Sequence, residues 1–215
     1  MTVRSSPLQN RMTPRGDLEA VPARGLFTGN RGVLHNEYFT VGPARWKHRN
    51  WIICALSFKD RHRAVMTPRR WTELFFLDEA VALAVGHRPC AECRWAAYND
   101  WMDAASAEHP ATRFRASEAD AILHKERALP GARELRRHVM KLEDLPDGAF
   151  ILTSDSVPAL VRGKYIHPWS HTGYGAPARR GFGESLLLTP PTNIAALRAG
   201  YRPHIHPSAQ FSNDA

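Results

Sequence analysis

Long apolar runs and abundant cysteine are both missing from this chain of 215 residues. Its apolar stretches, such as 51–56 and 80–85, are far shorter than the roughly 18 residues of a membrane-spanning helix, so we expect no such helix. The amino-terminal residues lack the apolar segment of a signal peptide. Three cysteines are too few for a disulfide scaffold. Together these absences predict a protein of the reducing cytoplasm without a membrane partner.

The composition is that of a folded chain. Apolar residues make up 43% and charged residues 23%, which is enough for a core and excludes wholly disordered, collagen-like and coiled-coil proteins. The length allows one domain or two small domains that share an interface.

The charge balance is basic, with 29 lysines and arginines against 21 acidic residues, a net charge of +8. Residues 25–95 contain 11 basic and 6 acidic side chains and so carry five of the eight surplus charges. Such a region attracts polyanions, and nucleic acid is the first candidate partner. The alternative is an arginine-rich composition that serves only solubility.

Local patterns divide the chain into four parts. We expect residues 1–22 to form a mobile tail, because they are polar and interrupted by Pro7, Pro14 and Pro22. Residues 23–110 hold the basic region and a cysteine motif, residues 111–206 hold a helical connector and a strand-rich region, and residues 207–215 form a second tail.

Periodicity predicts short strands and short helices. The best strand covers 51–58 and places Ile52, Cys54, Leu56 and Phe58 on one apolar face. Asp78 and Gly86 are suited to begin and end a helix over 79–85. Further helices are expected over 91–107, from Ser117, over 133–140 and over 191–199, with strands at 71–77, 149–153, 158–161, 165–169 and 185–188. This mixture predicts an α+β fold with small antiparallel sheets and short helices.

The sharpest motif is Cys90-Ala91-Glu92-Cys93, which follows Gly86-His87-Arg88-Pro89. Two thiolates one turn apart at the start of a helix can bind one Zn²⁺ at about 2.3 Å. A redox pair of the thioredoxin type would need a βαβ setting that the sequence does not show. Two ordinary cysteines are the remaining alternative.

Residues 75–94 resemble the zinc-binding module of Ada-type DNA alkylation repair proteins, which has an aromatic strand followed by E-A-x-x-A-G-[FY]-R-P-C-x-x-C. The resemblance implies that Cys90 and Cys93 are zinc ligands beside a DNA backbone, and it makes 23–110 an Ada-like region. That module has two further cysteines before the strand, whereas this chain has only Cys54 there. The methyl-acceptor chemistry of those proteins is therefore not carried over. Segments 23–35, 86–94, 168–174 and 188–191 also resemble a family of uncharacterised bacterial proteins, which supplies no function.

The sequence does not determine the remaining zinc ligands. Cys54 is one alternative ligand, but it lies on the apolar face of its strand, so we expect it in the core instead. Residues 82–90 resemble 196–204, and this alignment puts His204 and His206 where the cysteines stand. These two histidines are candidates for a second ligand pair, unless the similarity reflects only a common way of leaving a helix.

Basic residues interleaved with tryptophans suggest a nucleic-acid surface, with phosphate contacts and base stacking. The expected contacts are Arg45, Lys47, Arg49, Arg61, Arg63 and Arg88. The alternative is a hairpin whose tryptophans pack inward.

A catalytic reading is also open, because His35, Glu37 and His124 supply base and metal-ligand types. The sequence thus predicts a structural zinc ion and salt-sensitive binding to a nucleic-acid backbone. Its alternatives are a metal-dependent hydrolase, such as a nuclease, and a metal-free interaction protein.

Overall fold

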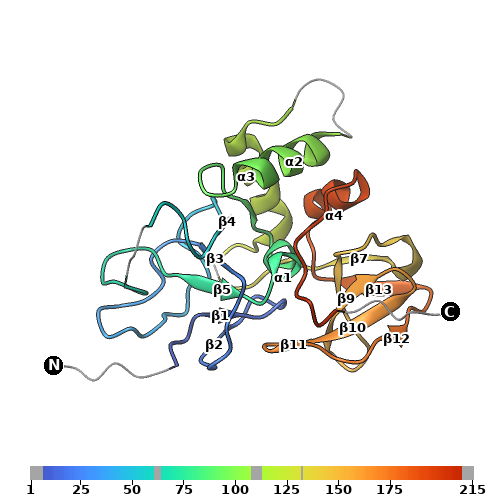
Figure 1. The fold of residues 1–215 in the computed structure, drawn as a ribbon, viewed down its shortest axis with the longest axis horizontal. Helices are drawn as coiled ribbons and strands as arrows, with labels where there is room; N and C mark the ends of the chain where they lie inside the picture. The colour runs from blue at the N-terminus through green and yellow to red at the C-terminus, as the bar shows by residue number, and fades with distance from the viewer. Residues whose placement is uncertain (1–6, 61–63, 108–112, 132, 210–215) are drawn as a thin grey trace.

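Two β-sheets stand side by side in the computed structural model, which describes residues 7–60, 64–107, 113–131 and 133–209 (Figure 1). The first sheet has the strand order β2-β1-β5-β3-β4-β6. Its β1–β5 and β4–β6 pairs are parallel and its other pairs are antiparallel. Its strands are β1 (Arg11–Met12), β2 (Leu18–Glu19), β3 (Phe27–Asn30), β4 (Ile52–Cys54), β5 (Leu74–Phe76) and β6 (Arg88–Pro89).

The second sheet is antiparallel and is built from the carboxy-terminal part of the chain. Its order is β11-β10-β9-β8-β13-β7, and β12 also pairs with β10. Its strands are β7 (His138–Lys141), β8 (Phe150–Leu152), β9 (Pro158–Arg162), β10 (Tyr165–Ser170), β11 (Gly173–Tyr174), β12 (Ala178–Arg179) and β13 (Glu184–Leu187).

Short helices complete the fold and confirm the predicted α+β class. Helix α1 (Glu79–Ala84) lies between the two sheets, while α2 (Trp95–Ser106), α3 (Ala116–Arg127) and α4 (Pro191–Arg198) lie together above them in Figure 1. A 3₁₀ turn, η1 (Leu142–Asp144), follows β7.

Helix α1 forms where the sequence predicted it. The Asp78 carboxylate accepts the Val81 N–H at 3.0 Å and caps the first turn. Gly86 follows the helix with φ of +82°, a conformation that glycine adopts without strain. All six residues of α1 are buried, and its alanines let it pack closely between the sheets.

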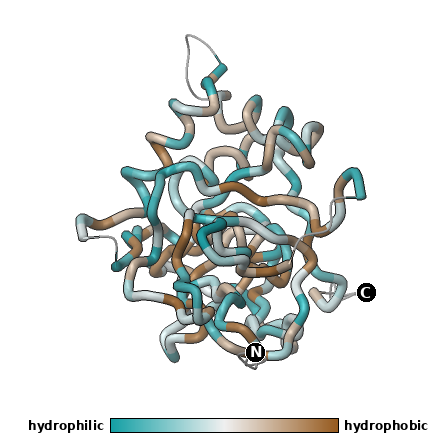
Figure 2. The backbone as a smooth tube through the Cα atoms, turned by 90° about the vertical axis from the view of Figure 1, so that its left-hand side faces the viewer, coloured by the Kyte–Doolittle hydropathy of each residue, from teal (hydrophilic) through white to brown (hydrophobic). Residues whose placement is uncertain are grey.

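Among the described residues, one large hydrophobic cluster extends across both sheets and the helices. It joins Leu74 and Phe76 of the first sheet, Val81 of α1, and Phe150 and Leu160 of the second sheet. In Figure 2 the hydrophobic stretches of the backbone lie mainly toward the middle and the hydrophilic ones toward the outside. The two sheets therefore do not have separate cores.

The carboxy-terminal segment fastens α1 to the second sheet. Tyr201 donates its hydroxyl to Glu79 at 2.5 Å, and Tyr174 donates its hydroxyl to Asp78 at 2.7 Å. The backbone N–H groups of His204 and His206 donate to the same two carboxylates, each at 2.9 Å. Because all these acceptors are buried, the segment is held by charge-assisted hydrogen bonds.

Several predicted elements differ from the structure. Residues 11–12 and 18–19 are strands rather than a mobile tail, because Met12 and Leu18 are buried against the first sheet. The expected helix at 133–140 is replaced by β7, which pairs with β13. In the expected tail at 207–215, Ala209 is buried and residues 210–215 lie outside the described residues.

Candidate metal centre

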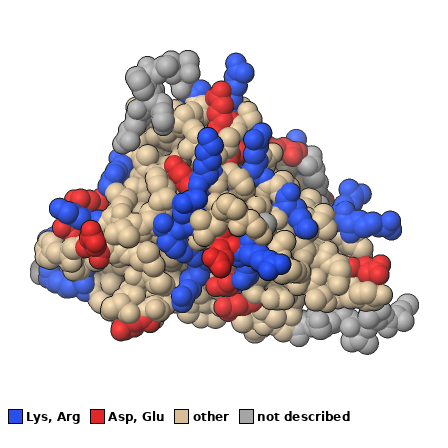
Figure 3. All heavy atoms as spheres, turned by 180° about the vertical axis from the view of Figure 1, so that it is seen from behind, with Lys and Arg blue, Asp and Glu red and all other residues tan. Residues whose placement is uncertain are grey.

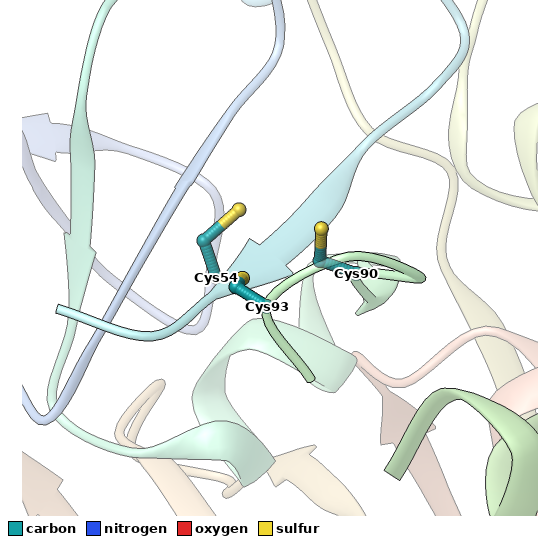
Figure 4. A group of neighbouring side chains, drawn as sticks. All are labelled: Cys54, Cys90 and Cys93. Atoms are coloured by element: carbon teal, nitrogen blue, oxygen red, sulfur yellow. The ribbon is translucent and has the colours of Figure 1, made fainter. Parts of the chain in front are cut away.

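Three cysteines from two separate places in the chain meet at the end of the β4–β6 pair (Figure 4). Cys54 ends β4, and Cys90 directly follows β6. The parallel pairing continues past β6, because the Cys90 N–H donates to the Ile53 carbonyl at 2.9 Å. Cys93 lies in the turn that leads into α2. The backbone thus brings together thiols that are 36 residues apart in sequence.

The sulfur positions fit a single metal ion. All three Sγ atoms lie within 4.8 Å of one another. A tetrahedral zinc ion with Zn–S bonds of about 2.3 Å separates its sulfur ligands by about 3.8 Å. Among the described residues, no other group of three or more His, Cys, Asp or Glu ligand atoms is gathered in this way.

Backbone N–H groups support two of the sulfurs. The Ala55 N–H lies 3.4 Å from the Sγ atom of Cys93, and the Glu92 N–H lies 3.4 Å from that of Cys90. Hydrogen bonds from Cys54 and Cys93 lower the pKa of the Cys90 thiol well below its ordinary value, whereas the hydrogen bonds to Cys90 raise the pKa of Cys54 and contribute to the raised pKa of Cys93. Without a metal the cluster therefore favours one thiolate, at Cys90, beside two thiols, and a bound metal would displace the remaining two protons.

The prediction that Cys54 belongs to the core is wrong. The sequence pattern placed Ile52, Cys54 and Leu56 on the buried face, but the structure buries Trp51 and Ile53 completely instead. Both faces of this segment are apolar, so alternation alone cannot tell which face points inward. The sulfur of Cys54 consequently joins the Cys-x-x-Cys pair rather than the core.

The sulfurs line a cleft of about 530 Å³ on the outer face of the first sheet. Its floor consists of alternate residues of three neighbouring strands, which project from the same face. They are Ile52 and Cys54 of β4, Thr28 and Asn30 of β3, and Glu73 and Phe75 at β5. The opposite face of the same strands carries Ile53, Leu74 and Phe76 into the core.

Aromatic and acidic side chains complete the cleft. Phe58 and Trp71 line it beside Glu73, whose buried carboxylate accepts the Met66 N–H at 2.6 Å. Glu92 is exposed and lines the same cleft between the two cysteines of the motif. A metal held by the three sulfurs would therefore face an accessible space.

The structure does not bring His204 and His206 to the cysteines. His204 packs edge-on against Phe27, with 5.6 Å between ring centroids, and its backbone is held by Glu79. The His206 ring contacts the Ser208 hydroxyl at 2.8 Å. The resemblance of 196–204 to 82–90 thus reflects similar exits from α4 and α1, each with a positive-φ glycine.

The three catalytic candidates do not form a common site. His35 is buried, with Nδ1 at 2.7 Å from the Thr72 hydroxyl, whereas Glu37 is exposed. His124 packs edge-on against Trp46 and Trp51. No metal-binding group among the described residues includes any of these three.

The expected nucleic-acid contacts have different surroundings. Lys47 and Arg49 are exposed, and Arg45 is paired with Asp17 at 3.0 Å. Arg88 is buried and bound to Asp120, which removes it from the accessible surface. Arg61 and Arg63 lie outside the described residues.

Two tryptophans of the basic stretch, Trp46 and Trp51, pack inward, as the alternative interpretation expected. Trp46 and Trp51 are buried, so neither offers a face to a nucleic-acid base. Instead the guanidinium groups of Arg31 and Arg127 stack on Trp51, with Cζ at 4.0 and 3.9 Å from the ring centroid. No sequence signal marked these two buried arginines, because nothing local in the chain links them to Trp51.

In the part of the chain that the structure describes, no helix has both the length and the apolar character needed to cross a membrane. No protein-family model, curated protein or solved structure matches the chain.

Proposed function

We propose that this chain is a zinc-binding protein and that Cys54, Cys90 and Cys93 are the ligands. The observation that carries the proposal is the convergence of all three sulfurs within 4.8 Å. The chain has only three cysteines, so every thiol it possesses is in this cluster. Cysteines that served only as small apolar residues would not be expected to cluster in this way.

The donor set favours zinc over harder cations. Thiolates select zinc, copper(I) and iron–sulfur clusters, whereas magnesium and calcium prefer oxygen. Zinc requires no redox chemistry and accepts three protein sulfurs with one further ligand. A bound ion would tie β4 to the segment between β6 and α2, which agrees with a contribution to stability.

Metal analysis of the purified, untagged protein tests the proposal. After dialysis against a weak chelator we expect about one zinc per chain, and Cys54→Ser and Cys90→Ser should each lose most of it. Ser57→Ala, at an exposed position beside the same strand, is the matched control and should keep the metal. Wild-type protein without stoichiometric metal would refute the assignment.

We also propose that the protein binds nucleic acid through backbone contacts. The net charge of +8 supports this, as do the exposed side chains of Lys47 and Arg49. Figure 3 shows lysine and arginine side chains down the middle of one face, with acidic side chains beside their upper part and near their lower end. Binding measured at several salt concentrations tests the proposal, because phosphate contacts give a steep loss of affinity with salt.

A further inference from the structure

A single row of side chains runs across four strands of the first sheet. Cys54 is paired with Thr28, Thr28 with Phe75, and Phe75 with Arg11. Directly paired residues project from the same face of a sheet, here the face opposite the core. With strands about 4.8 Å apart, the backbone positions of Cys54 and Arg11 are about 14 Å apart.

Two hollows follow this row and share a wall. The cleft beside the cysteines meets a second hollow of about 550 Å³, and both are lined by Leu56, Val65 and Phe75. The second hollow is lined by Arg11 and Arg24. The Arg11 guanidinium stands over the Phe75 ring, with Cζ at 4.8 Å from its centroid. The two hollows are therefore adjacent, and together they form a groove that extends from the sulfurs past an apolar middle to a basic end.

The charges in the groove are separated. Glu73 and Glu92 line the sulfur end, whereas the described lining of the other hollow contains two arginines and no carboxylate. Burial and the nearby charge of Arg24 lower the pKa of Arg11. Arg11 already donates from Nε to the Ala23 carbonyl at 2.5 Å and from Nη1 to the Asn10 side chain. An anion would therefore meet the Nη2 group of Arg11 and the exposed Arg24, and it would relieve the repulsion between the two arginines. The groove thus fits a ligand with an anionic group at one end only.

A metal ion held by the three sulfurs would need a fourth ligand. Zinc sites with three protein ligands normally take the fourth from water or a substrate, and the sulfurs here line an open cleft. A centre of three thiolates is soft and favours a fourth sulfur, and a thiol that coordinates zinc loses its proton.

We propose that the groove binds a small thiol that also carries a carboxylate or phosphate group. Its sulfur would be the fourth ligand of the metal, its carbon chain would lie along Leu56 and Phe75, and its anionic group would meet Arg11 and Arg24. This inference rests on the proposed metal centre, and it adds the chemical class of the ligand.

Cobalt(II)-substituted full-length protein supplies the test, because its visible and near-ultraviolet absorption reports each sulfur that joins the metal. Three probes are titrated: mercaptooctanoate, the shorter mercaptopropionate and the uncharged mercaptooctanol. Mercaptooctanoate should intensify the sulfur-to-cobalt band and bind about tenfold more tightly than either of the others, since it alone reaches both ends of the groove.

Arg11→Gln and Arg24→Gln should each reduce that advantage, and Arg198→Gln, on α4, should not. Arg24 is exposed, so its variant keeps the test valid if Arg11→Gln fails to fold.

Three outcomes overturn the proposal. One is equal affinity for mercaptooctanoate and mercaptooctanol, which would show that no anion site exists. Another is a cobalt spectrum that no added thiol changes but that the substitution His62→Ala does change. That result would show that the chain itself supplies the fourth ligand. Residue 62 lies outside the described residues. A protein that shows no cobalt–sulfur band before any thiol is added would instead refute the metal centre.

Discussion

Arg88 and Asp120 form a buried, two-pronged ion pair, with Nε–Oδ1 and Nη2–Oδ2 distances of 2.8 and 2.7 Å. The pair joins β6 to α3, and β6 leads directly into Cys90. The Arg88 guanidinium also lies over the Tyr98 ring of α2, at 5.6 Å from its centroid. The position of one proposed metal ligand therefore depends on a contact with a helix that contributes no ligand.

Asp120→Asn should destabilise the protein by about 3–5 kcal/mol, because it leaves a buried guanidinium without its counter-charge. For a chain of this size that corresponds to a fall in melting temperature of roughly 6–20 °C. Thermal unfolding measures the change, and zinc affinity should fall with it. Asp103→Asn is the matched control, since its pair with Arg113 is exposed and should contribute at most about 1 kcal/mol. Equal effects of the two substitutions would contradict this account.

His87 should make the protein sensitive to acid. Complete burial, followed by the nearby charge of Arg31, holds the pKa of His87 well below its ordinary value of 6.5. The folded state therefore keeps this ring neutral, while the unfolded chain takes up a proton below pH 6.5. The stability linked to His87 is fully present above pH 6.5 and is lost as the pH falls toward the folded-state pKa, with a slope of up to about 1.4 kcal/mol per pH unit.

Urea unfolding at pH 5, 6 and 7 should show this loss in the wild-type protein and a smaller loss in His87→Phe. Phenylalanine can keep the ring contacts with Phe76 and Trp51 without a titrating nitrogen. The difference between the two proteins removes any common contribution from metal release. His171→Gln, in the turn between β10 and β11, removes a histidine that contacts Glu19 at 2.8 Å instead of the core, and this variant should retain the acid sensitivity. Parallel curves for wild type and His87→Phe would rule His87 out as its source.

Tyr201 should contribute to stability through its hydrogen bond to Glu79. Glu79 also receives two bonds from Arg94, at 2.7 and 2.8 Å, and this network fastens the carboxy-terminal segment to α1. Tyr201→Phe removes only the hydroxyl and leaves a buried acceptor with one donor fewer, so we expect a loss of about 1–3 kcal/mol. Tyr38→Phe, at an exposed position, should change the unfolding free energy by less than about 0.5 kcal/mol. If Tyr201→Phe unfolds with the same free energy as the wild type and the control, this hydrogen bond does not hold the carboxy-terminal segment.

Local patterns in the sequence were sufficient for the fold class and for several elements. The helix after Asp78 was predictable because its cap, its apolar content and its glycine stop all agree. Cys90 and Cys93 were recognisable as a pair because both belong to one short motif. The role of Cys54 was not, because it depends on which face of β4 points inward and on the pairing of β4 with β6.

The remaining errors also come from long-range contacts. Residues 133–140 were predicted to form a helix, but the last of them belong to β7, which pairs with β13 more than 40 residues away. Arg88 looks like a phosphate contact in a basic sequence, yet Asp120 of α3 holds it in the interior. Such outcomes depend on tertiary partners that periodicity and composition do not specify.

Charge reversal at Lys47 and Arg49 tests whether the exposed surface around these two residues binds nucleic acid. Lys47→Glu combined with Arg49→Glu should weaken binding to a single-stranded oligonucleotide by about tenfold or more at low salt and reduce the slope of log affinity against log salt, since two phosphate contacts are lost. Fluorescence anisotropy over a salt series measures both quantities. Lys164→Glu, in the turn between β9 and β10 and also exposed, changes the net charge in the same direction but lies on the second sheet. A similar loss in both proteins would trace binding to overall charge rather than to this surface, and no binding by the wild type at low salt would refute the nucleic-acid proposal altogether.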